Sequence, residues 1–212
     1  MGLVSVNVSL PKYLGEHRGR PVLSGIAKVA VVAEEIRLDR ENLEGDGQGD
    51  PNLHGGLDKA VYAYPSEHLA PWSAELGQEL APAAFGENLT TTGWTEDDVR
   101  IGDLWEWGDA VLEVCQPRWP CYKLAMYRGR GGIQRRMHAN GRTGWYLRVL
   151  EPGLVPVAGP VRVQRHPALA SVRLAHDAAS PDSGVPDEVI EALLALPAMA
   201  DEWKMRLVSR LP

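Results

Sequence analysis

Short apolar runs separated by turn residues fill the chain up to about residue 165, and this pattern leaves little room for long helices. Runs of this kind, rich in small and β-branched residues, are typical of strands. The predicted strands are Ser24–Val32, Ala60–Tyr64, two strands within 105–116 that turn at Gly108-Asp109, Gly144–Leu150 and Val155–Gln164. Short strands at irregular spacing favour a mainly β, barrel-like domain with some helix mixed in.

A few short helices are expected around these strands. Ser66 is a candidate N-cap for a helix that reaches about Leu76. Residues 124–126 and 133–138 have helical character, and Gly141 suits the position just after a helix end.

After residue 166 the pattern changes to helical stripes, which indicates a small C-terminal helical tail. Ser171–Ala178 is expected to be a short helix, Val189–Leu194 carries an apolar stripe, and Asp201 is a candidate cap for a last helix. The predicted organisation has three parts: an N-terminal segment over 1–23 that packs on the barrel, a β-barrel domain over 24–165 and a helical tail over 166–212.

The chain is acidic overall, with a formal net charge of −6, but its basic residues are unevenly placed. Residues 118–148 contain eight basic side chains and no Asp or Glu, which leaves 14 of the 22 basic residues to face all 28 acidic ones elsewhere. Either a local anion site or a solvated basic helix face would explain this segment. The net charge argues against general binding to nucleic acid or to an anionic membrane.

The sequence predicts a cytoplasmic protein without a membrane partner. No apolar run approaches the ~18 residues that a membrane span needs, and the first ten residues lack the basic and apolar regions of a signal peptide. The two cysteines, Cys115 and Cys121, are too few for a disulfide-stapled scaffold or for a self-contained iron–sulfur cluster.

The segment Gln116–Leu124 gives Cys121 an unusual local setting. Prolines on both sides of an Arg-Trp pair fix backbone angles, so the chain reaches Cys121 through a stiff, irregular stretch. Arg118 and Lys123 would favour the thiolate, which is the form of cysteine that binds metal or attacks an electrophile. A buried structural thiol is the alternative, and for Cys115, within a predicted strand, it is the better interpretation.

Two further segments contain residue types that suit a ligand pocket. His54-Gly55-Gly56 precedes Asp58-Lys59, and paired glycines let backbone amides approach an anion that the histidine could also contact. Phe85–Leu89 contains Asn88, which could line a pocket or satisfy turn amides. Taken alone, the segment with His54 is better interpreted as a turn, and the Phe85–Leu89 segment is only a weak signal.

Taken in order, these segments resemble the MOSC domain, the module named after the C-terminal part of molybdenum cofactor sulfurase. The resemblance covers roughly residues 24–165 and is strongest to stand-alone bacterial members of the YiiM type, which are linked to detoxification of 6-N-hydroxylaminopurine. The matching segments are Leu43–Asp46, His54–Gly56, Phe85–Leu89, Ile101–Asp103, Pro117–Leu124 and Gly144-Trp145. The resemblance implies a compact, mixed β-barrel fold with short helices and a small C-terminal helical tail.

The resemblance also implies that Cys121 ligates molybdenum, with the other sulfur ligands supplied by the dithiolene of a molybdopterin-type cofactor. It implies that basic and Gly-rich segments bind the pterin phosphate and line the pocket. The residues assigned in this way are Arg118, Lys123, His54, Gly55, Gly56, Lys59 and Asn88. His54 is also a candidate catalytic proton donor beside Cys121, because an ordinary histidine pKa of about 6.5 suits proton transfer near neutrality.

The expected reaction is the two-electron reduction of an N-hydroxylated base, or of a related small molecule, to its amine. A separate electron-donating reductase is an expected partner, because the chain has no flavin or dinucleotide motif and too few cysteines for a cluster. The alternatives are a non-catalytic carrier of the cofactor or of sulfur on Cys121, and a metal-free cysteine hydrolase that uses Cys121 with His54. The resemblance further allows binding of pyridoxal phosphate.

Overall fold

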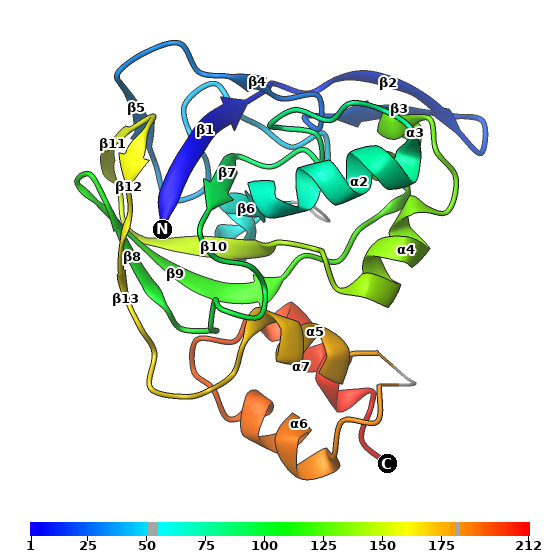
Figure 1. Cartoon of the computed structure of the whole chain (residues 1–212), viewed down its shortest axis with the longest axis vertical. Helices are drawn as coiled ribbons and strands as arrows, with labels where there is room; N and C mark the ends of the chain where they lie inside the picture. Colours follow the sequence, from blue (N-terminus) through cyan, green and yellow to red (C-terminus); the bar gives the residue numbers. More distant parts are fainter. Residues whose placement is uncertain (51–54, 181–182) are drawn as a thin grey trace.

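The computed structural model describes residues 1–50, 55–180 and 183–212, and it is built around one curled sheet (Figure 1). The strands of this sheet are β1 (Gly2–Val8), β4 (Val29–Ala30), β6 (Val61–Pro65), β7 (Leu89–Thr92), β8 (Leu104–Trp107), β9 (Ala110–Pro117), β10 (Trp145–Glu151), β12 (Gly159–Pro160) and β13 (Arg162–Gln164). Their order is β12-β1-β7-β6-β10-β9-β8-β13, with β4 added to β1. Neighbours are antiparallel except β6 and β7, which run parallel.

Two small sheets complete the β structure. β2 (Lys12–His17) and β3 (Arg20–Ser24) form a hairpin, and β5 (Glu35–Leu38) pairs with β11 (Gly153–Pro156). Strand β1 hydrogen-bonds to both β12 and β7, so the first residues of the chain contribute a strand to the main sheet.

The curled sheet packs on a core that is rich in tryptophan. Trp105 of β8 and Trp145 of β10 are fully buried, and their rings meet edge to face with centroids 6.0 Å apart. The chain is 31% strand and 25% helix, and its main sheet curls into a half-barrel. The predicted mainly β fold with short helices is therefore confirmed.

The predicted strand over Ser24–Val32 is wrong. β3 ends at Ser24, and only Val29–Ala30 pairs again, as β4. A Cβ atom on Gly25 would lie 2.2 Å from the carbonyl oxygen of Gly47, so the backbone here packs against another loop instead of pairing in a ladder. The apolar composition indicated burial correctly, but the burial is in a loop that lines a pocket.

The predicted helices form with corrected boundaries. α2 (Leu69–Leu76) follows two 3-10 turns of the chain, η1 (Leu57–Lys59) and η2 (Ser66–His68), so Ser66 begins η2 and does not cap α2. α3 (Tyr122–Arg128) packs on α4 (Ile133–Asn140). Gly141 ends α4 in the left-handed region, at φ 66°, as its sequence position predicted.

Helices α5 (Val172–Ala178), α6 (Asp187–Leu194) and α7 (Asp201–Val208) form the C-terminal end of the chain, at the bottom of Figure 1. Ser171 caps α5, because its hydroxyl accepts a hydrogen bond from the Leu174 N–H at 3.0 Å. The expected capping role of Asp201 is wrong, since Ala200 is the N-cap of α7 and Asp201 is its first residue. Across the described residues, no helix combines the length and the apolar character needed to cross a membrane.

An aromatic cluster joins these helices to the segment between β9 and α3. The Trp119 ring lies 4.1 Å from the His138 ring of α4 and 5.8 Å from the Trp203 ring of α7, measured between centroids. The Arg206 guanidinium stacks on Trp119, 4.6 Å from the ring centre. His176 of α5 is fully buried and stacks on His138, with centroids 5.8 Å apart. The helices therefore support the backbone just before α3.

This cluster makes the stability of the fold sensitive to acid. Burial, together with repulsion from His176 and nearby arginines, lowers the pKa of His138 from 6.5 to about 4. As pH falls from 6.5 towards 4, His138 becomes protonated in the unfolded chain but stays neutral in the folded chain. The free energy of unfolding therefore decreases over that pH window, and this group causes no loss above it. We expect His138→Gln to reduce the acid-induced loss of unfolding free energy between about pH 7.5 and pH 5 by about 1 kcal/mol, because solvent screens this partly exposed side chain. Urea unfolding at both pH values measures the difference, and an identical pH dependence in the two proteins would contradict it.

Candidate functional site

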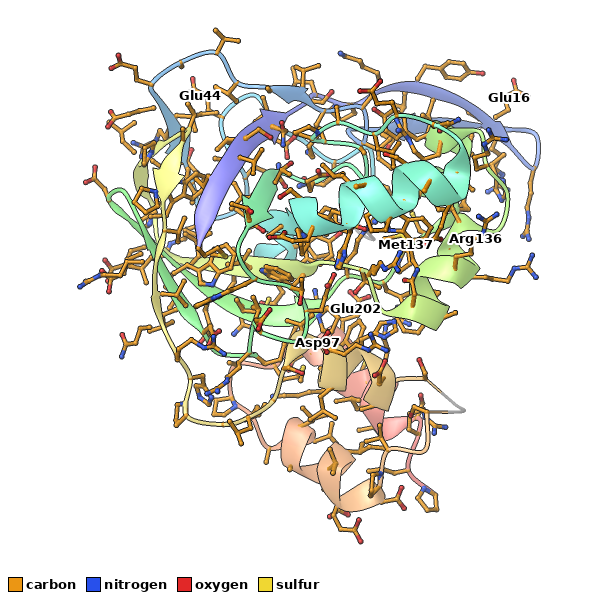
Figure 2. The ribbon with its side chains drawn as sticks, in the orientation of Figure 1. Glu16, Glu44, Asp97, Arg136, Met137 and Glu202 are labelled. Carbon is orange, nitrogen blue, oxygen red and sulfur yellow. The ribbon has the colours of Figure 1, made fainter. Side chains whose placement is uncertain are left out.

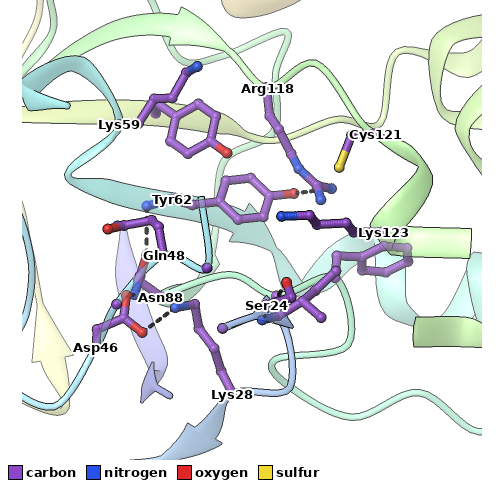
Figure 3. A pocket seen from close by; sticks show the side chains of 17 residues that line it. Ser24, Lys28, Asp46, Gln48, Lys59, Tyr62, Asn88, Arg118, Cys121 and Lys123 are labelled. Carbon is purple, nitrogen blue, oxygen red and sulfur yellow. Dashed lines mark hydrogen bonds and ion pairs between the residues drawn. The ribbon is translucent and has the colours of Figure 1, made fainter. Parts of the chain in front are cut away.

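Loops from four distant parts of the chain surround one open pocket (Figure 3). The lining comes from residues within 24–28, 46–49, 85–88 and 118–123, together with Lys59, Tyr62 and Tyr146. The pocket is open to solvent and encloses about 590 Å³ when that open part is counted. Its described lining contains the cations Lys28, Lys59, Arg118 and Lys123 and the carboxylate Asp46. The pocket is therefore mainly cationic.

Arg118 is a buried cation with no carboxylate partner among the described residues. Only 6% of the residue is exposed, and its Nη1 atom donates to the Tyr62 hydroxyl oxygen at 3.2 Å. That hydroxyl in turn donates to the Thr143 carbonyl at 2.8 Å. Burial raises the pKa of Tyr62 well above its ordinary value, so the hydroxyl stays neutral and does not offset the arginine charge. Because a buried charge is costly without a counter-charge, this position favours an anionic ligand.

Lys123 is a second buried cation in the same pocket, also 6% exposed. Its ammonium donates to the Leu23 carbonyl at 3.3 Å, and it has no carboxylate partner in the described parts of the chain. In Figure 3 its amine and the Arg118 guanidinium point into the same hollow. Two neighbouring cations that have no carboxylate partner in the described chain favour an anionic ligand such as a phosphate group.

Cys121 stands at the edge of this hollow, directly before α3, and it is partly exposed to solvent. The proline-flanked loop starts where β9 ends, and the Arg118 N–H donates to the Gly144 carbonyl at 3.0 Å, which fixes the loop against β10. The backbone at Cys121 is extended, with φ −113° and ψ 173°. The segment that the sequence singled out thus delivers its thiol and both flanking cations to one pocket.

Cys115 has the structural role that its sequence position predicted. It is fully buried on β9, and its Sγ contacts the carbonyl oxygens of Asp58 at 3.3 Å and Tyr146 at 3.5 Å. Burial raises the pKa of this thiol, so it stays protonated and unreactive. Cys121 is the thiol that lies on the pocket.

Asp46 and Lys28 form a polar wall that sequence reasoning missed as part of the site. The Asp46 carboxylate accepts hydrogen bonds from the Ser9 N–H at 2.9 Å and from the Asn88 side-chain amide at 2.8 Å, and it pairs with Lys28. Burial lowers the pKa of Lys28, although the Asp46 charge opposes this shift. Asp46 lies within a segment that supported the family resemblance, whereas no sequence pattern marked Lys28, Tyr62 or Tyr146.

In the Phe85–Leu89 segment, Glu87 and Asn88 have different roles. Glu87 is fully buried and accepts hydrogen bonds from the N–H groups of Ala83 at 2.8 Å and Phe85 at 2.9 Å, so it organises the loop. Burial raises the pKa of Glu87, and these hydrogen bonds oppose that shift. Asn88 lines the pocket, and its side-chain oxygen accepts a hydrogen bond from the Tyr62 N–H at 3.1 Å.

The segment around residues 54–59 is brought only partly to the pocket in the described structure. Lys59 lies on the pocket lining and forms an ion pair with Glu202 of α7. Gly55 and Gly56 are not part of the described lining, although Gly56 has a φ of 96°. His54 lies outside the described residues. The cofactor-binding roles of the two glycines and the catalytic role of His54 therefore stay predictions.

The described residues contain no group of three or more His, Cys, Asp and Glu side chains that could hold a metal ion. The donor set fits a molybdenum–pterin cofactor in two respects: one soft sulfur donor, Cys121, lies on the pocket, and two buried cations face the same hollow. The anionic phosphate and dithiolene of such a cofactor would supply the missing negative charge.

The MOSC domain matches residues 50–162, which is more than half of the chain. The chain belongs to the MOSC domain family, so its function is related to the molybdenum cofactor with which that domain is associated. Over nearly its whole length it is similar to YiiM of Escherichia coli, with 35% identity covering 97% of this chain and 91% of YiiM. YflK of Bacillus subtilis is 39% identical, covering 98% of this chain and 93% of YflK.

Solved structures agree with this assignment. The crystal structure of YiiM from Geobacillus stearothermophilus superposes with a TM-score of 0.81 at 30% identity, covering 99% of this chain and 98% of that one.

A protein of Gibberella moniliformis named as a reductase is 41% identical over 105 residues, which are 47% of this chain and 18% of the reductase. The likeness to the YiiM proteins therefore includes the C-terminal helices, whereas the reductase shares only part of the chain.

Proposed function

We propose that this protein is an oxidoreductase that binds a molybdenum–pterin cofactor through Cys121 and reduces N-hydroxylated bases or related compounds to their amines. The observation that carries the proposal is a pair of buried cations, Arg118 and Lys123, that have no carboxylate partner in the described chain and lie beside a partly exposed thiol. An ordinary surface pocket would not maintain two such charges, because each costs free energy to desolvate. Similarity to a protein named as a reductase supports redox chemistry over simple binding.

The protein's own residues bind and orient in this proposal. Arg118 and Lys123 hold the anionic parts of the cofactor, Cys121 supplies a thiolate ligand to molybdenum, and Asn88 with Lys59 lines the rim. When bound, the cofactor supplies the two-electron redox chemistry. Electrons come from a separate reductase, and His54 is the candidate that donates a proton to the leaving oxygen.

The overall reaction defines what must be delivered to the site. The N–O bond of the substrate breaks, the nitrogen product is an amine, and the oxygen leaves as water, with two electrons and two protons consumed. Tyr146 lines the pocket, and burial raises its pKa, so its hydroxyl remains a hydrogen-bond donor near neutral pH. The pocket therefore contains a neutral donor as well as fixed positive charge.

Replacement of Cys121 tests the ligand assignment. We expect Cys121→Ser, purified from a host that makes the cofactor, to retain less than about a tenth of the molybdenum per chain found in wild type, because a serine hydroxyl is a poor ligand for this soft centre. Elemental analysis for molybdenum and fluorescence of the oxidised pterin measure the content. Cys115→Ser is the matched control, since it makes the same chemical change at a thiol outside the pocket, and it should load normally.

The outcomes separate the proposed enzyme from its alternatives. Equal molybdenum in Cys121→Ser and wild type would refute the ligation. A loaded wild type that reduces no N-hydroxylated purine with dithionite-reduced methyl viologen would favour a carrier of the cofactor. Absorbance of a lysine Schiff base in the purified protein, with no molybdenum, would favour pyridoxal phosphate.

A further inference from the structure

The β2–β3 hairpin and the α3–α4 pair form one continuous face of the molecule. The His17 ring of β2 stacks on the Tyr122 ring of α3, with centroids 4.2 Å apart, and Lys123 of α3 hydrogen-bonds to the Leu23 carbonyl of β3. α3 also packs on α4. Figure 1 shows these elements together on the right-hand side of the view, and Figure 2 labels Glu16 and Arg136 on that side.

This face is strongly cationic in a protein whose net charge is −6. Its cations are Lys12, Arg18, Arg20, Arg128, Arg130, Arg135 and Arg136. None of them has an ion-pair partner among the described residues, and all are exposed except the half-buried Arg128. Within 12–24 and 122–141, Glu16 is the one carboxylate. Unpaired charge of one sign creates a field that extends into solvent and attracts an oppositely charged surface.

Exposed apolar side chains lie among these cations. Tyr13 and Leu23 are opposite each other on the hairpin and are 63% and 51% exposed, and Tyr122 of α3 is 38% exposed. The same elements border the pocket, because Ser24, Cys121 and Lys123 line it. Apolar groups with a charged surround are typical of protein interaction sites.

We propose that this face, named here the hairpin–α3–α4 face, is the docking surface for a small acidic electron-carrier protein. The inference rests on the proposed function, which consumes two electrons that the chain does not supply. A partner seated on this face would lie beside the Cys121 pocket, and its acidic surface would complement the unpaired cations. Electrostatic complementarity of this kind mainly raises the association rate and sets the orientation of the partners.

Charge reversal on the loaded enzyme tests the docking surface. The probes are two acidic carriers kept reduced in the assay, a plant-type [2Fe–2S] ferredoxin and a flavodoxin, with an N-hydroxylated purine as substrate. We expect Arg20→Glu/Arg136→Glu to raise the KM for the carrier about tenfold at low salt and to weaken its salt dependence. Turnover with reduced methyl viologen, which needs no docking surface, should stay unchanged.

A control with the same change in charge separates a local effect from a general one. Arg37→Glu/Arg162→Glu reverses two exposed cations on β5 and β13, on the opposite side of the molecule, and it should change the KM less than about twofold. An equal KM in wild type and Arg20→Glu/Arg136→Glu, or no use of either carrier while viologen supports turnover, would overturn the docking surface. Loss of binding to duplex DNA or to anionic phospholipid vesicles in that variant, with no change in carrier KM, would assign the face to those ligands instead. Failure with viologen as well would overturn the proposed reaction itself.

Discussion

Arg118→Met should remove most of the bound pterin without weakening the fold. The substitution keeps side-chain length but deletes the charge that has no carboxylate partner in the described structure. A charge-assisted hydrogen bond to an anion contributes about 1.5–3 kcal/mol, so we expect cofactor retention to fall about tenfold to a hundredfold. The free energy of unfolding of the cofactor-free protein should stay level or rise by about 1 kcal/mol, because a desolvated cation has been removed.

Pterin fluorescence after oxidation and urea unfolding measure the two quantities. Arg142→Met is the matched control, since Arg142 belongs to the same acid-free segment but pairs with Glu75 at 2.7 Å away from the pocket. It should load normally. Normal pterin content in Arg118→Met, or a large loss of stability in the cofactor-free protein, would show that Arg118 is a structural residue and not an anion ligand.

Gly144→Ala should destabilise the fold by about 3 kcal/mol or more, since both backbone strain and overlap add to the cost. Gly144 has φ +69°, and a Cβ atom there would lie 2.4 Å from the Ala63 carbonyl oxygen of β6. To relieve this overlap, β6 and β10 would have to separate, but the two strands pair directly beside Gly144. The Gly144 carbonyl also accepts the Arg118 N–H, so the pocket loop would move as well.

Gly77→Ala isolates the backbone-strain part of this effect. Gly77 has a similar φ of +62°, but no atom lies within 4 Å of its Cβ position. Only backbone strain remains there, and we expect a loss of about 1 kcal/mol. Urea unfolding gives both values. Equal losses of unfolding free energy in the two variants would mean that β6 and β10 can separate at little cost. Glycine would then be needed at position 144 only for its dihedral angles.

Local patterns in the sequence were enough to predict the strands on either side of Gly108-Asp109, the end of α4 at Gly141 and the chemical setting of Cys121. Turn residues, glycine at positive φ and proline act through the backbone of their immediate neighbours, so their effects can be inferred without the fold. Predictions from local patterns fail where the conformation of a segment depends on a contact with a distant part of the chain. The segment Ser24–Val32 has strand-like composition, but its loop conformation depends on a carbonyl group contributed by Gly47.

The sequence by itself determined the mainly β class, the acid-free basic segment and the single thiol that has cations on both sides. Only the tertiary structure decided which of those cations lose contact with water and lack a carboxylate in the described chain, and that the Lys28–Asp46 pair completes the wall. The physical reason is that desolvation and charge pairing depend on groups brought together from four distant loops. No local pattern specifies which distant groups will meet, so the cationic pocket forms only when the whole chain folds.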